Sequence, residues 1–470
     1  MTIAELSIEK AQEGLLSKEF SALEFLEEAL RIVEEKEPNL HAFLTLTPEL
    51  AKEAAKVTDE KIAKGQKLLA LSGIPCSVKD AILVQGVRCT AASRMLENYI
   101  APYDAFVTKK IKEAGVSIMG KTNMDEFGMG ASTENSSFGP TTNPVDPKRV
   151  PGGSSGGSAV SVASSESMIS LGEDTGGSIR QPASFCGIVG LKPTYGAVSR
   201  AGIISLASSL DQVGSLAKSA RDAEILFQVI QGKDPKDATS ISPPTTRKKM
   251  NMKELRIGIP KEYFAKGLDT DVKKVVEGAI QKFEQAGASL VEVELPSVEY
   301  ALAAYYVINT SEASSNLARY DGVRYGLHQE ASNLLGEYLD SRGAGFGKEV
   351  KRRIMLGTYA LSAGYYDAYY VKAQKVRSLL KQDFERAFLK ADVLMGPTSP
   401  VLPFRFGERT KDPLAMYLID IYTVPVNLVG LPAISLPAGT VGNLPVGLQV
   451  ISPAFSEDLL FSVGKMLEKL

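Results

Sequence analysis

Short apolar runs alternate with helical stretches along most of this 470-residue chain, and this alternation constrains its fold more than any other feature. After a polar, proline-bearing stretch at 231–251, residues 255–259 form a strand candidate, 270–286 a helix candidate and 290–293 a second strand candidate. This order is a β-α-β unit, in which a crossover helix joins two parallel strands. The sequence therefore predicts the α/β class, with a largely buried sheet.

Helical and strand signals continue on either side of this unit. The first 70 residues are expected to be helical, because Ser21 and Glu24 form a capping box before apolar residues at helical spacing. Thr47-Pro48 has the form of a helix cap and first helical position. The remaining strand candidates are residues 73–78, 116–119, 168–171, 392–395 and 446–450.

We expect these parts to form a single domain over residues 1–470, since a chain of this length can bury a large core. It would comprise an N-terminal helical part (1–70), a central core (71–230) and a second α/β part (252–470). Residues 298–390, which are mostly helical by pattern and rich in tyrosine, would be a helical insertion in the last part.

Composition gives no sign of a surface that binds nucleic acid. The formal net charge is −2, with 53 lysines and arginines against 55 aspartates and glutamates. Nucleic-acid-binding domains usually carry a basic stripe instead. The longest basic cluster, Arg247-Lys248-Lys249, is expected in a solvated loop.

Cysteine usage and hydropathy indicate a cytoplasmic protein. Cys76, Cys89 and Cys186 are odd in number and widely spaced. This fits neither a disulfide framework nor a zinc site, so we expect a reducing compartment and no metal. The N-terminus lacks the regions of a signal peptide, and no apolar run approaches the ~18 residues of a membrane span.

Residues 151–158, Pro-Gly-Gly-Ser-Ser-Gly-Gly-Ser, are the most unusual segment of the chain. Composition alone would suggest a flexible linker. The run leads instead into small residues and then into the strand candidate 168–171, which indicates a compact interior. A second run, Asp-Thr-Gly-Gly-Ser-Ile-Arg at 174–180, follows that strand candidate.

Two common chemistries of glycine-rich loops fit this sequence poorly. A phosphate-binding loop ends in Gly-Lys-Ser/Thr, and neither run contains a lysine. An α/β-hydrolase elbow needs Gly-x-Ser-x-Gly after a strand, together with a histidine base. Ser154 fits that pattern, but the residues before it are rich in proline. The two histidines, His41 and His328, are expected in helical stretches without catalytic surroundings.

A serine activated without histidine is the third chemistry. A hydroxyl needs a base to become a good nucleophile. Lysine can serve when burial lowers its pKa, because a low dielectric disfavours the ammonium. Lys79 ends the apolar stretch 74–78 and is the candidate base.

Together these residues resemble the amidase signature family. The resemblance is carried in order and spacing by Gly73-Ile74-Pro75, Val78-Lys79-Asp80, and the runs 151–158 and 174–180. It implies a central mixed β-sheet covered by α-helices on both faces. Within the family, the chain is similar to the A subunits of glutamyl-tRNA(Gln)/aspartyl-tRNA(Asn) amidotransferases. The stretches that carry this second likeness are 120–130, 351–377 and 422–428.

The resemblance implies a Ser-Ser-Lys mechanism. Ser154 matches the nucleophile of the family, Ser178 the bridging serine and Lys79 the base. Neutral Lys79 would take a proton through Ser178, so that Ser154 attacks the side-chain amide of glutamine.

Five further positions receive a role. Consecutive backbone N–H groups of Thr175, Gly176 and Gly177, with that of Ser178, would form the oxyanion hole, where each preorganised donor stabilises the transition state by roughly 2.7–4 kcal/mol. Arg353 would bind the α-carboxylate of glutamine, and Asp420 its α-ammonium.

The resemblance also implies partners. Ammonia would pass to a B subunit, which uses ATP and Mg²⁺ to amidate mischarged Glu-tRNA(Gln), Asp-tRNA(Asn) or both. A small C subunit would complete a heterotrimer, and this chain would hold no cofactor and reach tRNA only through the B subunit. Two alternatives stay open: a stand-alone amidase of the same family, and a non-catalytic scaffold subunit.

Overall fold

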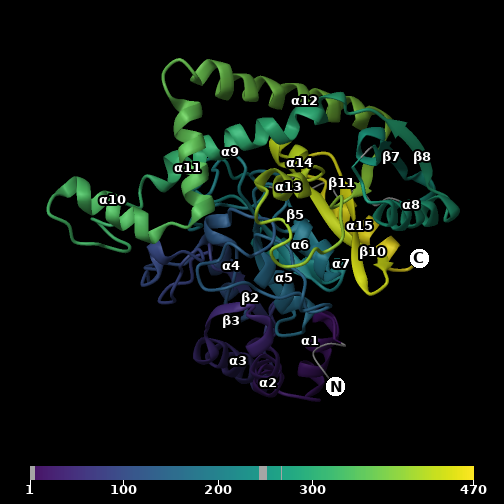
Figure 1. Ribbon diagram of the computed structural model, residues 1–470. Helices are drawn as coiled ribbons and strands as arrows, with labels where there is room; N and C mark the ends of the chain where they lie inside the picture. The colour runs from purple at the N-terminus through teal and green to yellow at the C-terminus, as the bar shows by residue number, and fades with distance from the viewer. Residues whose placement is uncertain (1–5, 243–250, 266) are drawn as a thin grey trace.

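Eleven strands form one mixed sheet in residues 6–242, 251–265 and 267–470, which are the residues that the computed structural model describes (Figure 1). The strand order is β1-β3-β2-β4-β6-β5-β10-β11-β9-β7-β8. The strands are β1 (Phe43–Leu46), β2 (Pro75–Lys79), β3 (Ser117–Thr122), β4 (Ile169–Asp174), β5 (Val189–Lys192), β6 (Gln212–Ala217), β7 (Arg256–Pro260), β8 (Ser289–Val293), β9 (Val393–Pro397), β10 (Ala433–Val441) and β11 (Leu444–Ile451). Pairs such as β2–β4 are parallel and pairs such as β4–β6 antiparallel, so the expected central mixed sheet of the α/β class is confirmed.

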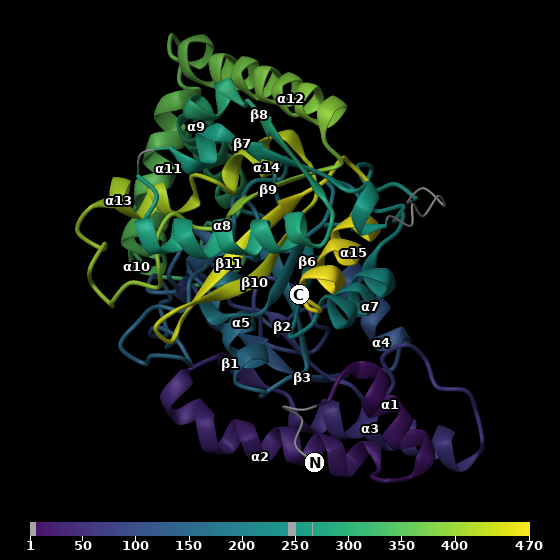
Figure 2. The ribbon, with the colours of Figure 1, turned by 90° about the vertical axis from the view of Figure 1, so that its right-hand side faces the viewer.

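Helices surround this sheet. They are α1 (Ile8–Ser17), α2 (Ala22–Leu40), α3 (Pro48–Ala63), α4 (Phe106–Glu113), α5 (Gly156–Ala163), α6 (Arg180–Cys186), α7 (Ala220–Ile230), α8 (Thr270–Gln285), α9 (Ala301–Leu317), α10 (Leu334–Gly345), α11 (Lys348–Leu361), α12 (Lys372–Lys390), α13 (Pro413–Tyr417), α14 (Val424–Val429) and α15 (Glu457–Leu467). The first three lie at one end of the molecule, and α9, α11 and α12 lie at the other (Figure 1). Figure 2 shows α7, α8 and α15 in front of the sheet. Helix α10 projects from the body.

Local signals near the N-terminus are partly confirmed. Ser21 and Glu24 form the expected capping box at the start of α2. Pro48 is the first residue of α3, but the hydroxyl of Thr47 does not cap that helix; it donates to the carbonyl oxygen of Ile118 at 2.8 Å. The expectation that the first 70 residues are all helical is wrong, because β1 pairs with β3 and extends the sheet there.

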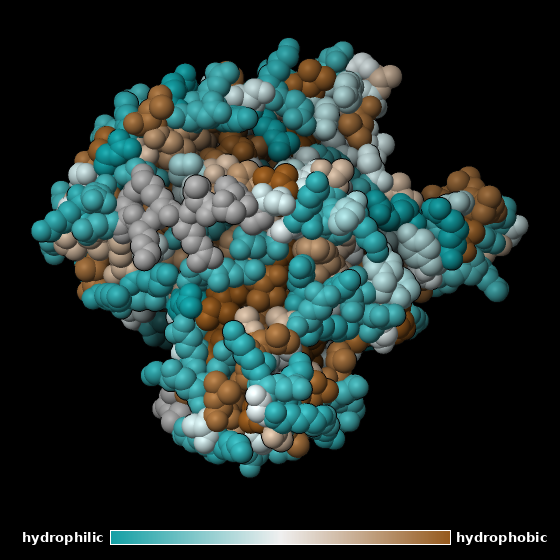
Figure 3. Space-filling view, turned by 180° about the vertical axis from the view of Figure 1, so that it is seen from behind, coloured by the Kyte–Doolittle hydropathy of each residue, from teal (hydrophilic) through white to brown (hydrophobic). Residues whose placement is uncertain are grey.

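The surface carries polar residues over most of the face seen from behind, with apolar residues among them (Figure 3). The projecting α10 is one place where apolar side chains gather, with Leu334, Leu335 and Leu339 each at least 60% exposed. No helix within the described ranges is both long and apolar enough to cross a membrane. The basic cluster Arg247-Lys248-Lys249 lies outside the described residues.

The topology brings the two unusual loops together at one edge of the sheet. Strands β2 and β4 are parallel neighbours, with Val78 beside Leu171, so their carboxyl ends meet at the same edge. Lys79 is the last residue of β2, and Asp174 the last of β4. The run 174–180 therefore starts beside Lys79, and the run 151–158 enters α5 at the same place.

Candidate active site

The glycine- and serine-rich run is part of the interior and not a linker, since every residue from 151 to 158 is buried. At two of its positions, neighbouring atoms leave no room for a side chain, which explains why glycine stands there. A Cβ on Gly153 would lie 2.2 Å from Asp125 Oδ2, and one on Gly157 would lie 2.4 Å from the carbonyl oxygen of Ala42. Any larger residue at either position would push neighbouring segments apart.

Lys79 contacts Ser154 directly. Its Nζ donates to Ser154 Oγ at 2.8 Å and to the carbonyl oxygen of Glu173 at 3.0 Å. The carboxylate of Glu173 lies 3.6 Å from the same Nζ. All three residues are almost fully buried. The lysine is thus placed to exchange a proton with a serine hydroxyl.

Burial governs the protonation of Lys79 and Glu173. Loss of hydration lowers the pKa of Lys79 and raises the pKa of Glu173, because each charged form is disfavoured away from water. Their mutual attraction opposes both shifts. A lysine with a pKa below its ordinary range is suited to general-base work, since more of it is neutral near pH 7.

The contacts differ from the expected order of the two serines. A bridging hydroxyl must touch the base, and it is Ser154 that touches Lys79. Among the described residues, no hydrogen bond involves the hydroxyl of Ser178, which is 8% exposed against 1% for Ser154. The bridging position assigned to Ser178 is therefore wrong in this geometry, because Lys79 reaches Ser154 without an intermediary.

Asp174 holds the loop that carries Ser178. Its carboxylate accepts the N–H groups of Gly177 at 2.8 Å and Ile179 at 3.0 Å. It also pairs with Arg180 through contacts of 3.0 and 3.1 Å. Burial alone would raise the pKa of Asp174, but the guanidinium holds that pKa well below its usual range. The ionised carboxylate therefore fixes the loop from inside.

This arrangement changes the expected set of oxyanion donors. The N–H of Gly177 is engaged by Asp174. In the described part of the chain, the N–H groups of Thr175, Gly176 and Ser178 have no protein acceptor. Thr175 lies in the same loop, and its hydroxyl donates to Asp211 at 2.8 Å. The N–H groups of Thr175, Gly176 and Ser178 are thus the donors that remain available to a ligand.

Asp420 borders this loop with an unpartnered oxygen. Its Oδ1 is buried and lacks a hydrogen-bond partner within the residues described. A Cβ on Gly177 would lie 3.1 Å from that oxygen. Burial raises the pKa of Asp420 well above its ordinary range, and the charge of Asp174 raises it further. A cationic group of a ligand would satisfy this carboxylate.

Arg353 is the buried member of its basic run. It is 4% exposed, whereas the side chain of Arg352 is 44% exposed. Arg353 Nε donates to Glu349 Oε1 at 2.8 Å and Nη1 to Asn309 Oδ1 at 3.3 Å. Across the described ranges, no hydrogen bond involves Nη2. One edge of a fixed guanidinium therefore remains for an anionic ligand group.

A cavity reaches this arginine. It has a volume of about 340 Å³, and Arg353 and Tyr417 are among its lining residues. The guanidinium carbon of Arg353 lies 5.3 Å from the ring centre of Tyr306 and 5.4 Å from that of Tyr417. The two rings limit where the guanidinium can move, because each attracts it.

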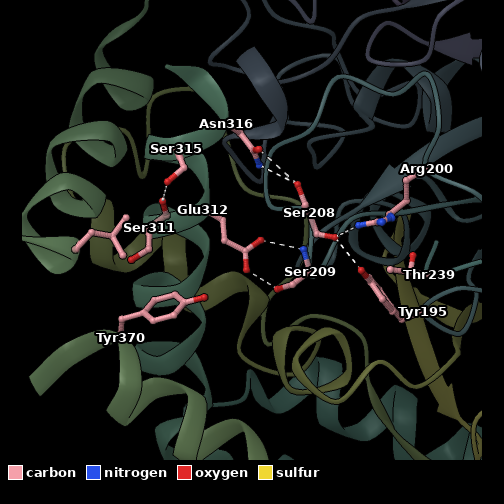
Figure 4. Close-up of a pocket in the computed structure, with 11 residues that line it drawn as sticks. Tyr195, Arg200, Ser208, Ser209, Thr239, Ser311, Glu312, Ser315, Asn316 and Tyr370 are labelled. Atoms are coloured by element: carbon pink, nitrogen blue, oxygen red, sulfur yellow. Dashed lines mark hydrogen bonds between the residues drawn. The ribbon is translucent and has the colours of Figure 1, made fainter. Parts of the chain in front are cut away.

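A second cavity, of about 420 Å³, lies between α9 and the segment 206–211 (Figure 4). Glu312 on α9 accepts the N–H of Ser209 at 2.9 Å and its hydroxyl at 2.5 Å. The segment ends at Asp211, which also accepts the hydroxyl of Thr175. None of the site residues expected from the sequence lines this cavity.

Among the described residues, no side-chain hydrogen bond joins either histidine to Lys79, Ser154 or Ser178. His41 is the exposed residue that ends α2. His328 is exposed too, and its Nδ1 is 2.8 Å from the carbonyl oxygen of Gly322. The expectation that His328 is helical is wrong, since it lies between helices. In the part of the chain described, no group of three or more histidine, cysteine, aspartate or glutamate residues is arranged to hold a metal ion.

Residues 24–461 match the family model described as Amidase. The chain belongs to the amidase signature family. Two relatives in this family are each named as the A subunit of a glutamyl-tRNA(Gln) amidotransferase. The one from Carboxydothermus hydrogenoformans is 55% identical, with 100% of this chain and 98% of the relative covered. The one from Microcystis aeruginosa is 53% identical, with 98% and 97% covered.

A solved amidase structure has the same architecture. The A subunit of the glutamyl-tRNA(Gln) amidotransferase from Thermotoga maritima is 41% identical, with a TM-score of 0.82 over 100% of this chain and 95% of that one. The family expected from the sequence motifs is therefore confirmed.

Sequence reasoning missed the residues that support the site. Glu173 faces Lys79, and Asp174 and Arg180 hold the Ser178 loop. Asn427 joins them, because its Nδ2 donates to Asp174 Oδ1 at 2.9 Å. Asp174 and Arg180 begin and end the run 174–180, but no pattern in the sequence indicates that they pair with each other.

Proposed function

We propose that this chain is the glutamine-hydrolysing subunit of a tRNA-dependent amidotransferase. The hydrogen bond between Lys79 and Ser154, beside the loop of Ser178, carries the proposal of amide hydrolysis. The names of relatives that are 53–55% identical over nearly their whole length support the more specific role.

The contacts favour an exchange of roles between the two serines. Ser178 attacks the carboxamide carbon of the substrate, and its proton passes to Ser154 Oγ while the proton of Ser154 passes to Lys79 Nζ. A neutral lysine can accept that proton, which is why burial at this position matters. Free N–H groups among those of Thr175, Gly176 and Ser178 stabilise the oxyanion of the tetrahedral intermediate.

The same relay completes the reaction in reverse. Lys79 returns its proton through Ser154 to the substrate nitrogen, the carbon–nitrogen bond breaks, and ammonia leaves. A glutamyl ester remains on Ser178. Water then attacks this ester with Lys79 as base, which releases glutamate and restores the hydroxyl of Ser178.

Two buried charges select glutamine among amides. The unpartnered Oδ1 of Asp420 suits the α-ammonium of glutamine. The remaining edge of the Arg353 guanidinium suits its α-carboxylate. Asp420 lies next to Gly177 in the Ser178 loop. Arg353 lines the cavity of about 340 Å³.

The rest of the reaction belongs to other chains. We infer a cytoplasmic heterotrimer, in which a B subunit uses ATP and Mg²⁺ to activate mischarged tRNA and a C subunit joins the two. This chain supplies ammonia, holds no cofactor of its own and reaches tRNA only through the B subunit.

A reactive glutamine analogue tests the chemistry. The assembled complex is treated with a diazoketone analogue of glutamine, and the modified peptide is identified by mass spectrometry. We expect the adduct on Ser178. It should be absent in Ser178→Ala and unchanged in Ser332→Ala, a serine exposed on the surface. An adduct on Ser154 would restore the order implied by the family resemblance, and no adduct on either serine would refute the proposed glutaminase.

A further inference from the structure

Two adjacent carboxyl groups, Asp125 and Glu126, face different parts of the site. The backbone N–H of Asp125 donates to the carbonyl oxygen of Ser154 at 3.2 Å. Its carboxylate accepts the N–H groups of Thr133 at 2.9 Å and Asn135 at 3.1 Å. Asp125 thus belongs to the scaffold of the Ser154 loop.

Glu126 holds the start of α11. Its Oε2 accepts the N–H of Gly347, the residue that caps this helix, at 2.9 Å. Its Oε1 accepts the hydroxyl of Ser93 at 2.5 Å. Ser93 Oγ also lies 3.2 Å from the carbonyl oxygen of Gly345, where α10 ends. Glu126 and Ser93 therefore bind the segment that joins the end of α10 to the start of α11.

Glu126 packs tightly against the segment between α10 and α11. Glu126 is 2% exposed, and a Cβ on Gly347 would lie 2.2 Å from Glu126 Oε2. Burial raises the pKa of Glu126 to about 7, so its hydrogen bonds, more than its charge, hold the start of the helix. The position of α11 is thus set by contact with Glu126 and not only by packing of its apolar face.

Helix α11 carries the arginine that reads the substrate. Arg353 lies six residues after Gly347, about 9 Å along the helix axis. Glu349, which fixes the Nε of Arg353, lies between them. A displacement of the helix start would move both side chains relative to the Ser154 loop.

We propose that Glu126 is a positioning residue for substrate recognition, which sets the place of Arg353 relative to the catalytic serines. This inference rests on the proposed role of Arg353 in glutamine binding. Glu126 touches neither substrate nor the reacting atoms; it acts through α11.

The test separates recognition from chemistry with two substrates of the assembled complex. Glutamine carries both α-charges, and butyramide offers the same carboxamide chain without them. For Glu126→Ala, we expect the KM for glutamine to rise by about tenfold, with kcat/KM for butyramide within about twofold of wild type, because a misplaced binding group costs recognition alone.

Two variants serve as controls. Glu126→Gln can still accept the N–H of Gly347 and donate to Ser93 Oγ, whose proton then goes to Gly345, so it should restore the KM. Glu97→Ala removes an exposed carboxylate near Ser93 and should behave as wild type. Equal losses on both substrates in Glu126→Ala would overturn the inference, because they would mean general support of the structure.

A second variant covers the case in which Glu126→Ala does not fold. Gly347→Ala keeps the carboxylate but forces it away from the helix start, since the backbone of Gly347 (φ −70°) tolerates alanine. It should show the same selective rise in KM and faster hydrogen exchange at the amides that begin α11. An unchanged KM for glutamine in Gly347→Ala would overturn the inference.

Arg353→Ala distinguishes this inference from the proposed function. If Arg353→Ala raises the KM for glutamine selectively and Glu126→Ala does not, only the positioning role of Glu126 fails. If Arg353→Ala affects both substrates equally, the proposed reading of the α-carboxylate fails, and the role of Glu126 fails with it.

Discussion

The chemistry of single residues depends on Lys79, whose amine is useful only when it is neutral. Burial lowers its pKa, so the neutral fraction grows as the pH rises through that lowered value. The kcat/KM for glutamine should therefore increase with pH and level off above the pKa of Lys79.

Lys79→Arg should remove this activity by at least about a thousandfold, because a guanidinium cannot give up its proton near neutral pH. Circular dichroism and co-purification with the partner subunits would show that the variant folds. A rate above about one per cent of wild type in the arginine variant would contradict the assignment of Lys79 as base.

Which serine meets the lysine could not be predicted from the sequence. Both runs offer a serine that follows two glycines, and the order along the chain places no constraint on distance. The answer depends on how the run 151–158 passes beside Lys79 in the folded chain. The residue types of the site were predictable from the family resemblance, whereas the contacts among them required the fold.

At the scale of secondary structure, some strands were predictable where apolar residues cluster in a short run. Residues 255–259 and 290–293 correspond to β7 and β8. Strand β6 was missed because its buried face includes polar side chains. Within it, the hydroxyl of Ser215 donates to the carbonyl oxygen of Ala223, and the amide of Gln212 to that of Asp211. A search for apolar runs does not detect a strand whose buried polar side chains are satisfied by such tertiary hydrogen bonds.

A half-buried carboxyl group on α2, Glu37, interacts with a buried one, Glu166, in the connection between α5 and β4. Glu37 on α2 accepts the N–H groups of Ala42 and Phe43 at 2.9 and 2.8 Å. Glu166 accepts the hydroxyl of Ser164 at 2.8 Å. Burial raises the pKa of Glu166, and the charge of Glu37 raises it further. The folded chain therefore favours the neutral form of Glu166.

Relative to wild type, Glu166→Gln should therefore stabilise the protein more at high pH than at low pH. The folded-state pKa of Glu166 lies above its unfolded value, so its contribution is complete at low pH and is lost as the pH rises through the folded-state pKa. Glutamine does not titrate. The Tm of the variant minus that of wild type should grow by about 1–3 °C between pH 6 and pH 9.

Glu27→Gln, an exposed position on the same helix as Glu37, is the control for this measurement and should show no such trend. A difference in Tm between Glu166→Gln and wild type that stays constant over this range would show that Glu166 does not titrate with folding.

At the scale of the whole molecule, one sheet passes through all three parts of the chain, with β1 from the first 70 residues and β7 to β11 from the part after residue 252. The sequence predicted the class because alternation is a local signal. It could not predict the order of the strands, since β5 pairs with β10 across more than 240 residues. Because β11 pairs with β10, this long-range pairing also brings Gln449 to the Ser178 loop. There Arg180 Nη1 donates to Gln449 Oε1 at 2.6 Å.

The division of labour between this chain and its partners can be tested on the intact assembly. A net charge of −2 gives this chain little electrostatic attraction for tRNA, because affinity for the phosphate backbone grows with the number of neutralising cations. The chain alone, given ATP, glutamine and mischarged Glu-tRNA(Gln), should therefore form no Gln-tRNA(Gln), and the complete complex should form it.

Ammonium chloride then separates the two halves of the reaction. A complex that carries Ser178→Ala should fail with glutamine but amidate tRNA at near wild-type rate with added ammonium, since the partner site can use ammonia from solution. Aminoacyl-tRNA analysis by acid gel and mass spectrometry would report the product. Failure of this rescue in a correctly assembled complex would mean that Ser178 also acts in the second half of the reaction. ATP-dependent amidation by the chain alone would refute the division itself.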